Sequence, residues 1–147
     1  MKFEHKVSLP RPKAEVDDAL ADIPAVARLI PGVEDVRQKE DGSYEGTVKV
    51  RVGPMVLTLK GDVGVEQDVD AGRWTMHARA QDKRIGGGIS ATIEALVTVA
   101  GPTTTDLDIA TDVQLLGRLG ELGQPLIKRK ASDMIKGFAD NLRAHLS

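Results

Sequence analysis

The hydrophobic residues of the chain change their spacing twice. Up to Leu9, apolar and charged side chains alternate, which predicts a short strand that stops at the prolines that follow. From Lys13 to Ile30 the apolar residues recur at helical spacing instead. We therefore predict two short helices, which end at Pro31 and Gly32.

Beyond Gly32, hydrophobic residues recur at every second position, and this alternation continues as far as Val113. Turns rich in glycine and proline divide the segment into six strands with short connections, which is typical of an antiparallel meander. The dividing segments are Asp41-Gly42, Gly53-Pro54, Asp70-Ala71-Gly72, Gly86-Gly87-Gly88 and Gly101-Pro102.

From about Glu121 the helical spacing returns and lasts to Leu146, which predicts one long amphipathic helix. Pro125 is tolerated only in a first turn, so the helix should begin near Leu122. The fold class is then α+β: a curved seven-stranded antiparallel sheet wrapped around a long C-terminal helix, with two short helices after the first strand. The length of 147 residues suits a single domain over residues 1–147.

The inward positions of this helix-grip arrangement are aliphatic and often small. Gly61 and several alanines should leave space there, and the chain has few aromatic residues to fill it. We predict an apolar ligand cavity, although alternation alone does not separate a cavity lining from a packed core. The predicted lining residues are Ile30, Val50, Leu57, Leu59, Met76, Ala78, Ala91, Ile93, Ile109, Val113, Leu122, Leu126 and Met134.

Connections in a meander alternate between the two ends of the sheet, so the turns can be sorted by end. One end collects most of the loop glycine, and we predict a mobile entrance there, with ordinary turn chemistry as the alternative. The predicted entrance loops contain Pro31, Gly32, Gly53, Pro54, Gly86, Gly87, Gly88, Gly117 and Gly120.

The two ends of the predicted sheet also differ in charge. The net charge is −2, which gives no bulk attraction to nucleic acid. Basic residues nevertheless collect at the predicted entrance, whereas the opposite end is mainly acidic. We predict docking to an anionic membrane surface or an acidic partner through Arg84, Arg118, Lys128 and Arg129. The alternative is a solvated charge distribution without a partner.

The sequence offers little for catalysis or metal binding. It contains no cysteine, and its three histidines lack metal-binding spacing. The segment Gly87-Gly88-Ile89-Ser90 joins two strands, whereas a nucleophile elbow requires a strand and a helix. Carboxylates such as Glu94 fall on the outward positions. We predict no metal site, no catalytic residue and no enzymatic activity.

Several motifs together resemble the CoxG family, which is named for a subunit of carbon monoxide dehydrogenase. They are Ile30-Pro31-Gly32-Val33-Glu34, Tyr44 to Val50 followed by Val52-Gly53-Pro54, Lys60-Gly61-Asp62-Val63, Asp112 to Gly120, and Phe138-Ala139-Asp140-Asn141-Leu142. The family belongs to the START-like, Bet v 1-like superfamily, which implies a helix-grip fold with a deep hydrophobic cavity. Family members often carry a C-terminal membrane-anchoring extension, but this chain ends at Ser147, so attachment through such a tail is not part of the prediction.

The resemblance implies a non-enzymatic accessory protein of a molybdenum hydroxylase of the carbon monoxide dehydrogenase type. No covalent cofactor is expected, and the bound lipophilic molecule would be an isoprenoid quinone such as menaquinone. The protein would be cytoplasmic, peripheral at the inner face of the cell membrane, and would link the enzyme to the quinone pool. Two alternatives stay open: a membrane-recruitment or assembly module with an incidental cavity, and an enzyme of the START-like cyclase type.

Overall fold

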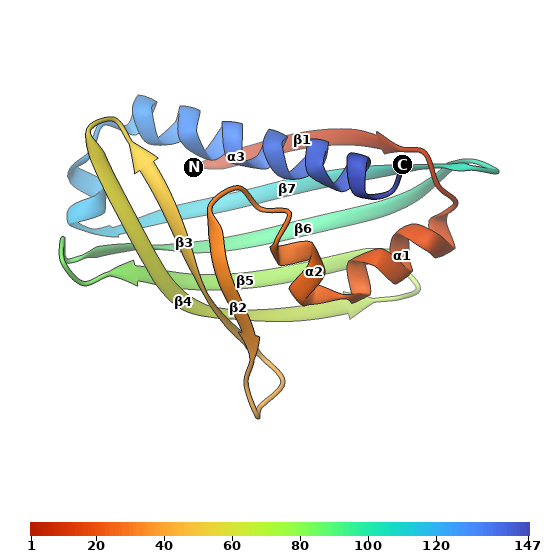
Figure 1. Ribbon diagram of the computed structural model, residues 1–147. Helices are drawn as coiled ribbons and strands as arrows, with labels where there is room; N and C mark the ends of the chain where they lie inside the picture. The colour runs from red at the N-terminus through yellow and green to blue at the C-terminus, as the bar shows by residue number, and fades with distance from the viewer.

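Seven antiparallel strands in the order β1-β7-β6-β5-β4-β3-β2 form the frame of the molecule (Figure 1). The computed structural model describes residues 1–147. All neighbours except β1 and β7 follow one another in sequence, so the predicted meander is confirmed. The strands are β1 (Lys2–Leu9), β2 (Val33–Gln38), β3 (Tyr44–Val52), β4 (Met55–Asp68), β5 (Arg73–Asp82), β6 (Gly87–Gly101) and β7 (Thr104–Gly117).

Two short helices follow β1, and one long helix ends the chain, as predicted. They are α1 (Lys13–Ala21), α2 (Ile23–Ala27) and α3 (Gln124–His145), with a 3₁₀ turn η1 (Arg118–Glu121) before α3. The predicted boundaries need two corrections. The helix α2 ends at Ala27 rather than at Pro31, and α3 begins at Gln124 rather than near Leu122, because η1 occupies the chain between the sheet and the helix.

The sheet curls sharply where three small residues lie side by side on neighbouring strands. Gly46 of β3 pairs with Gly61 of β4, and Gly61 pairs with Ala80 of β5. A Cβ atom at Gly61 would collide with the carbonyl oxygen of Arg79 and with Ala80. The prediction that Gly61 leaves space in the interior is therefore wrong, since the backbone of β5 occupies that position.

The helix α3 closes the curl from the other side. It runs alongside β1 and approaches β3, the strands near the two edges of the sheet (Figure 1). The loop before β2 is fixed to it, because Asn141 Nδ2 donates a hydrogen bond of 2.8 Å to the carbonyl of Leu29. Pro31 lies so close to Gly137 that a side chain at Gly137 would collide with it. No helix has the length and apolar character that crossing a membrane would require.

The substitution Gly61→Ala should destabilise the protein by about 1–3 kcal/mol, because the added methyl group meets backbone atoms of β5 that have no room to move. Gly64→Ala in the same strand is the matched control, since a Cβ atom there has no neighbour within 4 Å. Urea denaturation of both variants tests this explanation of the curl. Equal stability of the two variants would show that the contact at Gly61 is dispensable.

Candidate functional site

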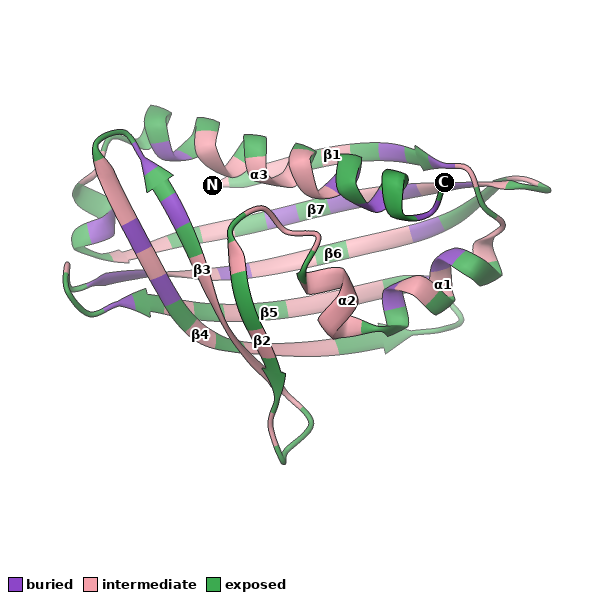
Figure 2. Ribbon diagram, in the orientation of Figure 1, coloured by how far each residue is buried: buried purple, intermediate pink, exposed green.

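The hydrophobic core consists of two separate clusters rather than one. Only 23 of the 147 residues are buried, and most of the apolar ones fall into these two groups (Figure 2). The far-end cluster lies beneath α1 and the last turns of α3, and it comprises Val7, Leu9, Val16, Leu20, Val97, Leu107, Ile109, Ala139, Leu142 and Leu146. The mouth-end cluster comprises Val50, Val52, Leu57, Leu59, Leu119 and Ile127.

A row of small residues crosses the inward face of the sheet between the two clusters. Val63, Ala78, Ala91 and Val113 pair in sequence across β4, β5, β6 and β7. None of the four belongs to either cluster. Ala91 is buried, whereas the other three are only half-buried although they face inward. We call these four residues the central row, and it is the part of the inward face that belongs to neither cluster.

The predicted lining residues divide between the packed clusters and the central row. Val50, Leu57 and Leu59 are buried in the mouth-end cluster, against which Leu122 and Met134 also pack. Ile109 is buried in the far-end cluster, and Ile93 packs against it.

The other predicted residues lie elsewhere. Ala78, Ala91 and Val113 form most of the central row, and Met76 is half-buried in the row beside it. Ile30 is half-buried in the loop before β2. Leu126 is 43% exposed at the start of α3. The structure thus separates residues that pack from residues that could border a ligand, which alternation does not do.

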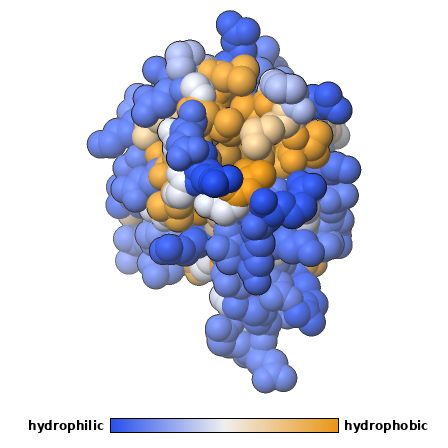
Figure 3. Space-filling model, turned by 90° about the vertical axis from the view of Figure 1, so that its left-hand side faces the viewer, coloured by the Kyte–Doolittle hydropathy of each residue, from blue (hydrophilic) through white to orange (hydrophobic).

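Three of the predicted entrance connections gather at one end of the molecule, which we call the mouth, whereas the loop before β2 lies nearer the middle (Figure 1). The β3–β4 turn, the β5–β6 turn and η1 all lie at the left-hand end in Figure 1. Viewed from that end, apolar side chains occupy the middle of the surface and hydrophilic side chains surround them (Figure 3). The apolar patch is consistent with the exposure of Leu126.

Four of the predicted entrance glycines adopt the left-handed backbone that only glycine takes readily: Gly32, Gly53, Gly86 and Gly117. Gly87 and Gly88 are different, because they are buried within β6. A side chain at Gly88 would collide with the carbonyl oxygen of Ala80. These two residues therefore serve close packing rather than loop motion.

A pocket of about 530 Å³ opens beside the mouth, between the loop before β2, the end of β3 and α3. We call it the basic pocket, because Lys49, Arg51 and Lys130 line it together with a single carboxylate, Glu34. Its other lining residues are Pro31, Gly32, Val33, Val56 and Met134. A second pocket of about 440 Å³, lined by Met1, Lys2, Gln124, Pro125 and Lys128, lies where β1 meets α3.

The basic pocket could not be predicted from the sequence. Lys49 and Arg51 alternate with inward valines of β3, which places them on the outward face of that strand. They border a pocket only because β2 starts at Val33 and α3 passes beside the uncovered end of β3. This arrangement is a property of the assembled fold and leaves no local signal in the sequence.

A buried carboxylate fixes the β5–β6 turn at the mouth. Asp82 is 3% exposed and accepts hydrogen bonds from the backbone N–H groups of Thr58 (2.9 Å) and Arg84 (3.0 Å). The guanidinium of Arg84 also donates to it, at 3.1 Å, and reaches the carbonyl of Val56. The side-chain hydrogen bond from Arg84, followed by the bond from Thr58, lowers the pKa of Asp82 to about 2.

These contacts bear on the predicted docking residues. Arg84 is held in its ion pair with Asp82, so its charge is largely neutralised by its own neighbour. Arg118, Lys128 and Arg129 are exposed and form no ion pair.

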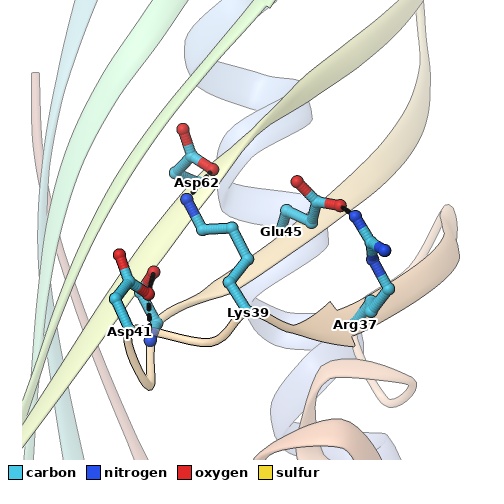
Figure 4. Close-up of polar contacts among 6 residues, drawn as sticks. Arg37, Lys39, Asp41, Glu45 and Asp62 are labelled. Carbon is cyan, nitrogen blue, oxygen red and sulfur yellow. Dashed lines mark hydrogen bonds and ion pairs between the residues drawn. The ribbon is translucent and has the colours of Figure 1, made fainter.

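Two ion pairs hold the β2–β3 hairpin, which projects from the bottom of the molecule in Figure 1 (Figure 4). Arg37 forms an ion pair with Glu45 across the two strands, and Lys39 reaches Asp62 of β4 at 2.8 Å. The hydrogen bonds raise the pKa of both Arg37 and Lys39. Asp41 accepts from the hydroxyl and backbone N–H of Ser43, which lowers the pKa of Asp41. These contacts tie the two strands of the hairpin to each other and to β4.

Polar chemistry is sparse on the inward face. Glu94 is exposed on an outward position of β6, as predicted, and His77 is exposed on an outward position of β5. Thr111 is buried at an inward position of β7, and the indole Nε1 of Trp74 is buried without a hydrogen-bond partner. The sequence analysis singled out neither residue. With no acid or base among the residues of the central row, this face is suited to binding an apolar molecule.

Comparison with known proteins supports this description of the fold. The model of the CoxG family, described as the CoxG subunit of carbon monoxide dehydrogenase, matches residues 6–147. No curated protein matches the sequence.

Several solved structures share the fold at low sequence identity. A conserved protein from Geobacillus kaustophilus superposes with a TM-score of 0.87 at 14% identity, covering 99% of this chain and 95% of that one. The Zhui aromatase/cyclase from Streptomyces sp. R1128 superposes with a TM-score of 0.75 at 15% identity, covering 99% of this chain and 93% of that one. A START superfamily protein from Mycobacterium smegmatis superposes with a TM-score of 0.68 at 14% identity, covering 99% of this chain and 96% of that one. The predicted START-like, Bet v 1-like helix-grip fold is confirmed.

Asp82→Asn should destabilise the protein by about 1–3 kcal/mol at neutral pH, since it removes the charge that three donors share. The folded pKa lies below the ordinary value, so the contribution of Asp82 is present above about pH 4 and is lost as the pH falls towards about 2. Denaturation of the wild type and the variant at pH 7 and pH 2 measures both effects. A stability difference that stays constant between those pH values would contradict the role given to the charge.

Proposed function

The chain belongs to the CoxG family of carbon monoxide dehydrogenase, and from this we propose that it is an accessory protein of a molybdenum enzyme of that type. In this proposal it binds a lipophilic molecule, an isoprenoid quinone such as menaquinone, and performs no catalysis itself. It would carry the quinone between the enzyme and the inner face of the cell membrane.

The observation that carries the proposal is that three inward-facing residues of the central row, between the two packed clusters, are only half-buried. The buried apolar side chains lie mainly in the clusters at either end, and the fully buried leucines Leu9, Leu107 and Leu142 lie in the far-end cluster. Within this proposal, the short side chains of the two alanines at the middle of the central row would leave space above the sheet. An elongated apolar molecule could occupy this space without displacing either cluster.

The chemistry of a quinone fits the inward face. Its isoprenoid tail gains from contact with aliphatic side chains at roughly 25 cal/mol per Å² of apolar surface removed from water. The unpartnered Nε1–H of Trp74 is a donor that a small shift of the side chain could direct at a ring carbonyl. The apolar patch at the mouth would then be the route of entry.

A second candidate is a membrane-recruitment or assembly module in which the cavity is incidental. It is favoured by the packing of Val50, Leu57, Leu59 and Ile109, four predicted lining residues that the clusters bury completely or nearly so. Co-purification with the enzyme that persists in a quinone-free variant would support this candidate.

The central row gives the most direct test of the carrier function. Ala78→Phe should prevent uptake of menaquinone, because the ring would project into the space beside Ala91. Arg79→Phe is the matched control on the exposed outward face of the same strand. Bound quinone is measured by extraction and mass spectrometry after incubation with menaquinone, and stability by urea denaturation.

The two measurements together decide the result. Loss of quinone from Ala78→Phe alone, with stability close to that of the wild type, supports the carrier. If Ala78→Phe is destabilised by about 1–3 kcal/mol and the wild type itself never retains quinone, the interior is packed and the proposal is rejected.

A further inference from the structure

We infer that the basic pocket binds the phosphate group of an anionic phospholipid and so seats the mouth on the bilayer. The inference rests on the proposed function, since it names the surface through which a quinone carrier would meet the membrane. It differs from the four-residue docking surface predicted from the sequence, because it places the contact in a formed pocket of other residues.

The first argument is that the cations of this pocket have no partners. Lys49, Arg51 and Lys130 all border it, and none forms an ion pair. Several cations elsewhere are paired, as Arg84 is with Asp82. Against three positive charges the pocket contains one carboxylate, Glu34. Converging unpaired Lys and Arg side chains are the usual partners of a phosphate group.

The second argument concerns the backbone at the edge of β3. The N–H of Lys49 donates to the carbonyl of Gly32 at 2.8 Å, the last bond before the two strands part. Donors alternate along a strand, so the N–H of Arg51 points to the same side, where β2 no longer runs. An open strand edge offers unpaired donors, and a phosphate oxygen could accept from this one.

The third argument is the neighbouring apolar surface. Leu126, Lys130 and Met134 are spaced four residues apart on α3 and therefore share one helix face. Leu126 is 43% exposed and lies against the β3–β4 turn at Gly53. A headgroup in the pocket would thus place its acyl chains beside an exposed leucine and the apolar patch in Figure 3. This pairing of cations with an inserting apolar side chain favours a lipid over an acidic peptide.

The test uses flotation of the full chain with vesicles of phosphatidylcholine, with and without phosphatidylglycerol. The triple variant Lys49→Gln, Arg51→Gln, Lys130→Gln should lower the affinity for the anionic vesicles at least roughly tenfold, since each basic residue near such a surface contributes about 1 kcal/mol. The triple variant Arg118→Gln, Lys128→Gln, Arg129→Gln removes the same charge at the same end but outside the basic pocket. It should have a clearly smaller effect.

Other outcomes overturn the inference. An equal loss of affinity for anionic vesicles in both triple variants would indicate diffuse charge attraction rather than binding in a pocket. Binding of inorganic phosphate, seen as chemical shift changes in β3, without binding to vesicles would assign the pocket to a soluble anion. If the triple variant of the basic pocket binds vesicles as the wild type does but no longer co-purifies with the enzyme, the pocket would be assigned to an acidic protein partner.

Retention of menaquinone separates this inference from the proposed function. The triple variant at Lys49, Arg51 and Lys130 should still bind menaquinone although it binds anionic vesicles weakly. The reason is that the three substituted residues lie outside the central row. A wild type that binds anionic vesicles through the pocket but never takes up quinone would reject the carrier and leave the lipid site standing.

Discussion

The structure depends on the close approach of β4 and β5 at Gly61. Because the backbone of β5 takes the place of a side chain there, the sheet turns sharply enough for α3 to lie alongside β1 and still approach β3. The apolar residues then pack at the two ends of the curl, where helices and loops cover the sheet. Between these ends, three of the four residues of the central row stay half-buried.

The charged residues follow a similar division of roles. Where a turn or hairpin needs to be held, the charges are paired, as Asp82 is with Arg84 and Lys39 is with Asp62. The three cations that line the basic pocket form no ion pair. Paired charges therefore fix the frame, and the unpaired ones are available to something outside the chain.

Much of the fold could be predicted from the sequence, because alternation and helical spacing report directly on which face of an element is buried. The alternation of apolar and polar residues from Val33 to Val113 predicted the meander and the end at which the turns gather. The helical spacing of apolar residues up to Leu146 predicted the long helix. The family resemblance rested on short motifs spread over nearly the whole chain, and the family model matches over the same span.

Only the tertiary structure decided what the inward residues do. Alternation assigns Leu59 and Ala78 to the same face, yet the first is buried in a cluster and the second is half-buried outside both clusters. Likewise, Lys49 is outward by its position in β3 and becomes part of a pocket only through the arrival of α3. By itself the sequence determined the order of the elements and their buried faces, since these follow from local spacing. Which inward residues pack and which cations converge depends on contacts between distant segments, and no local pattern records them.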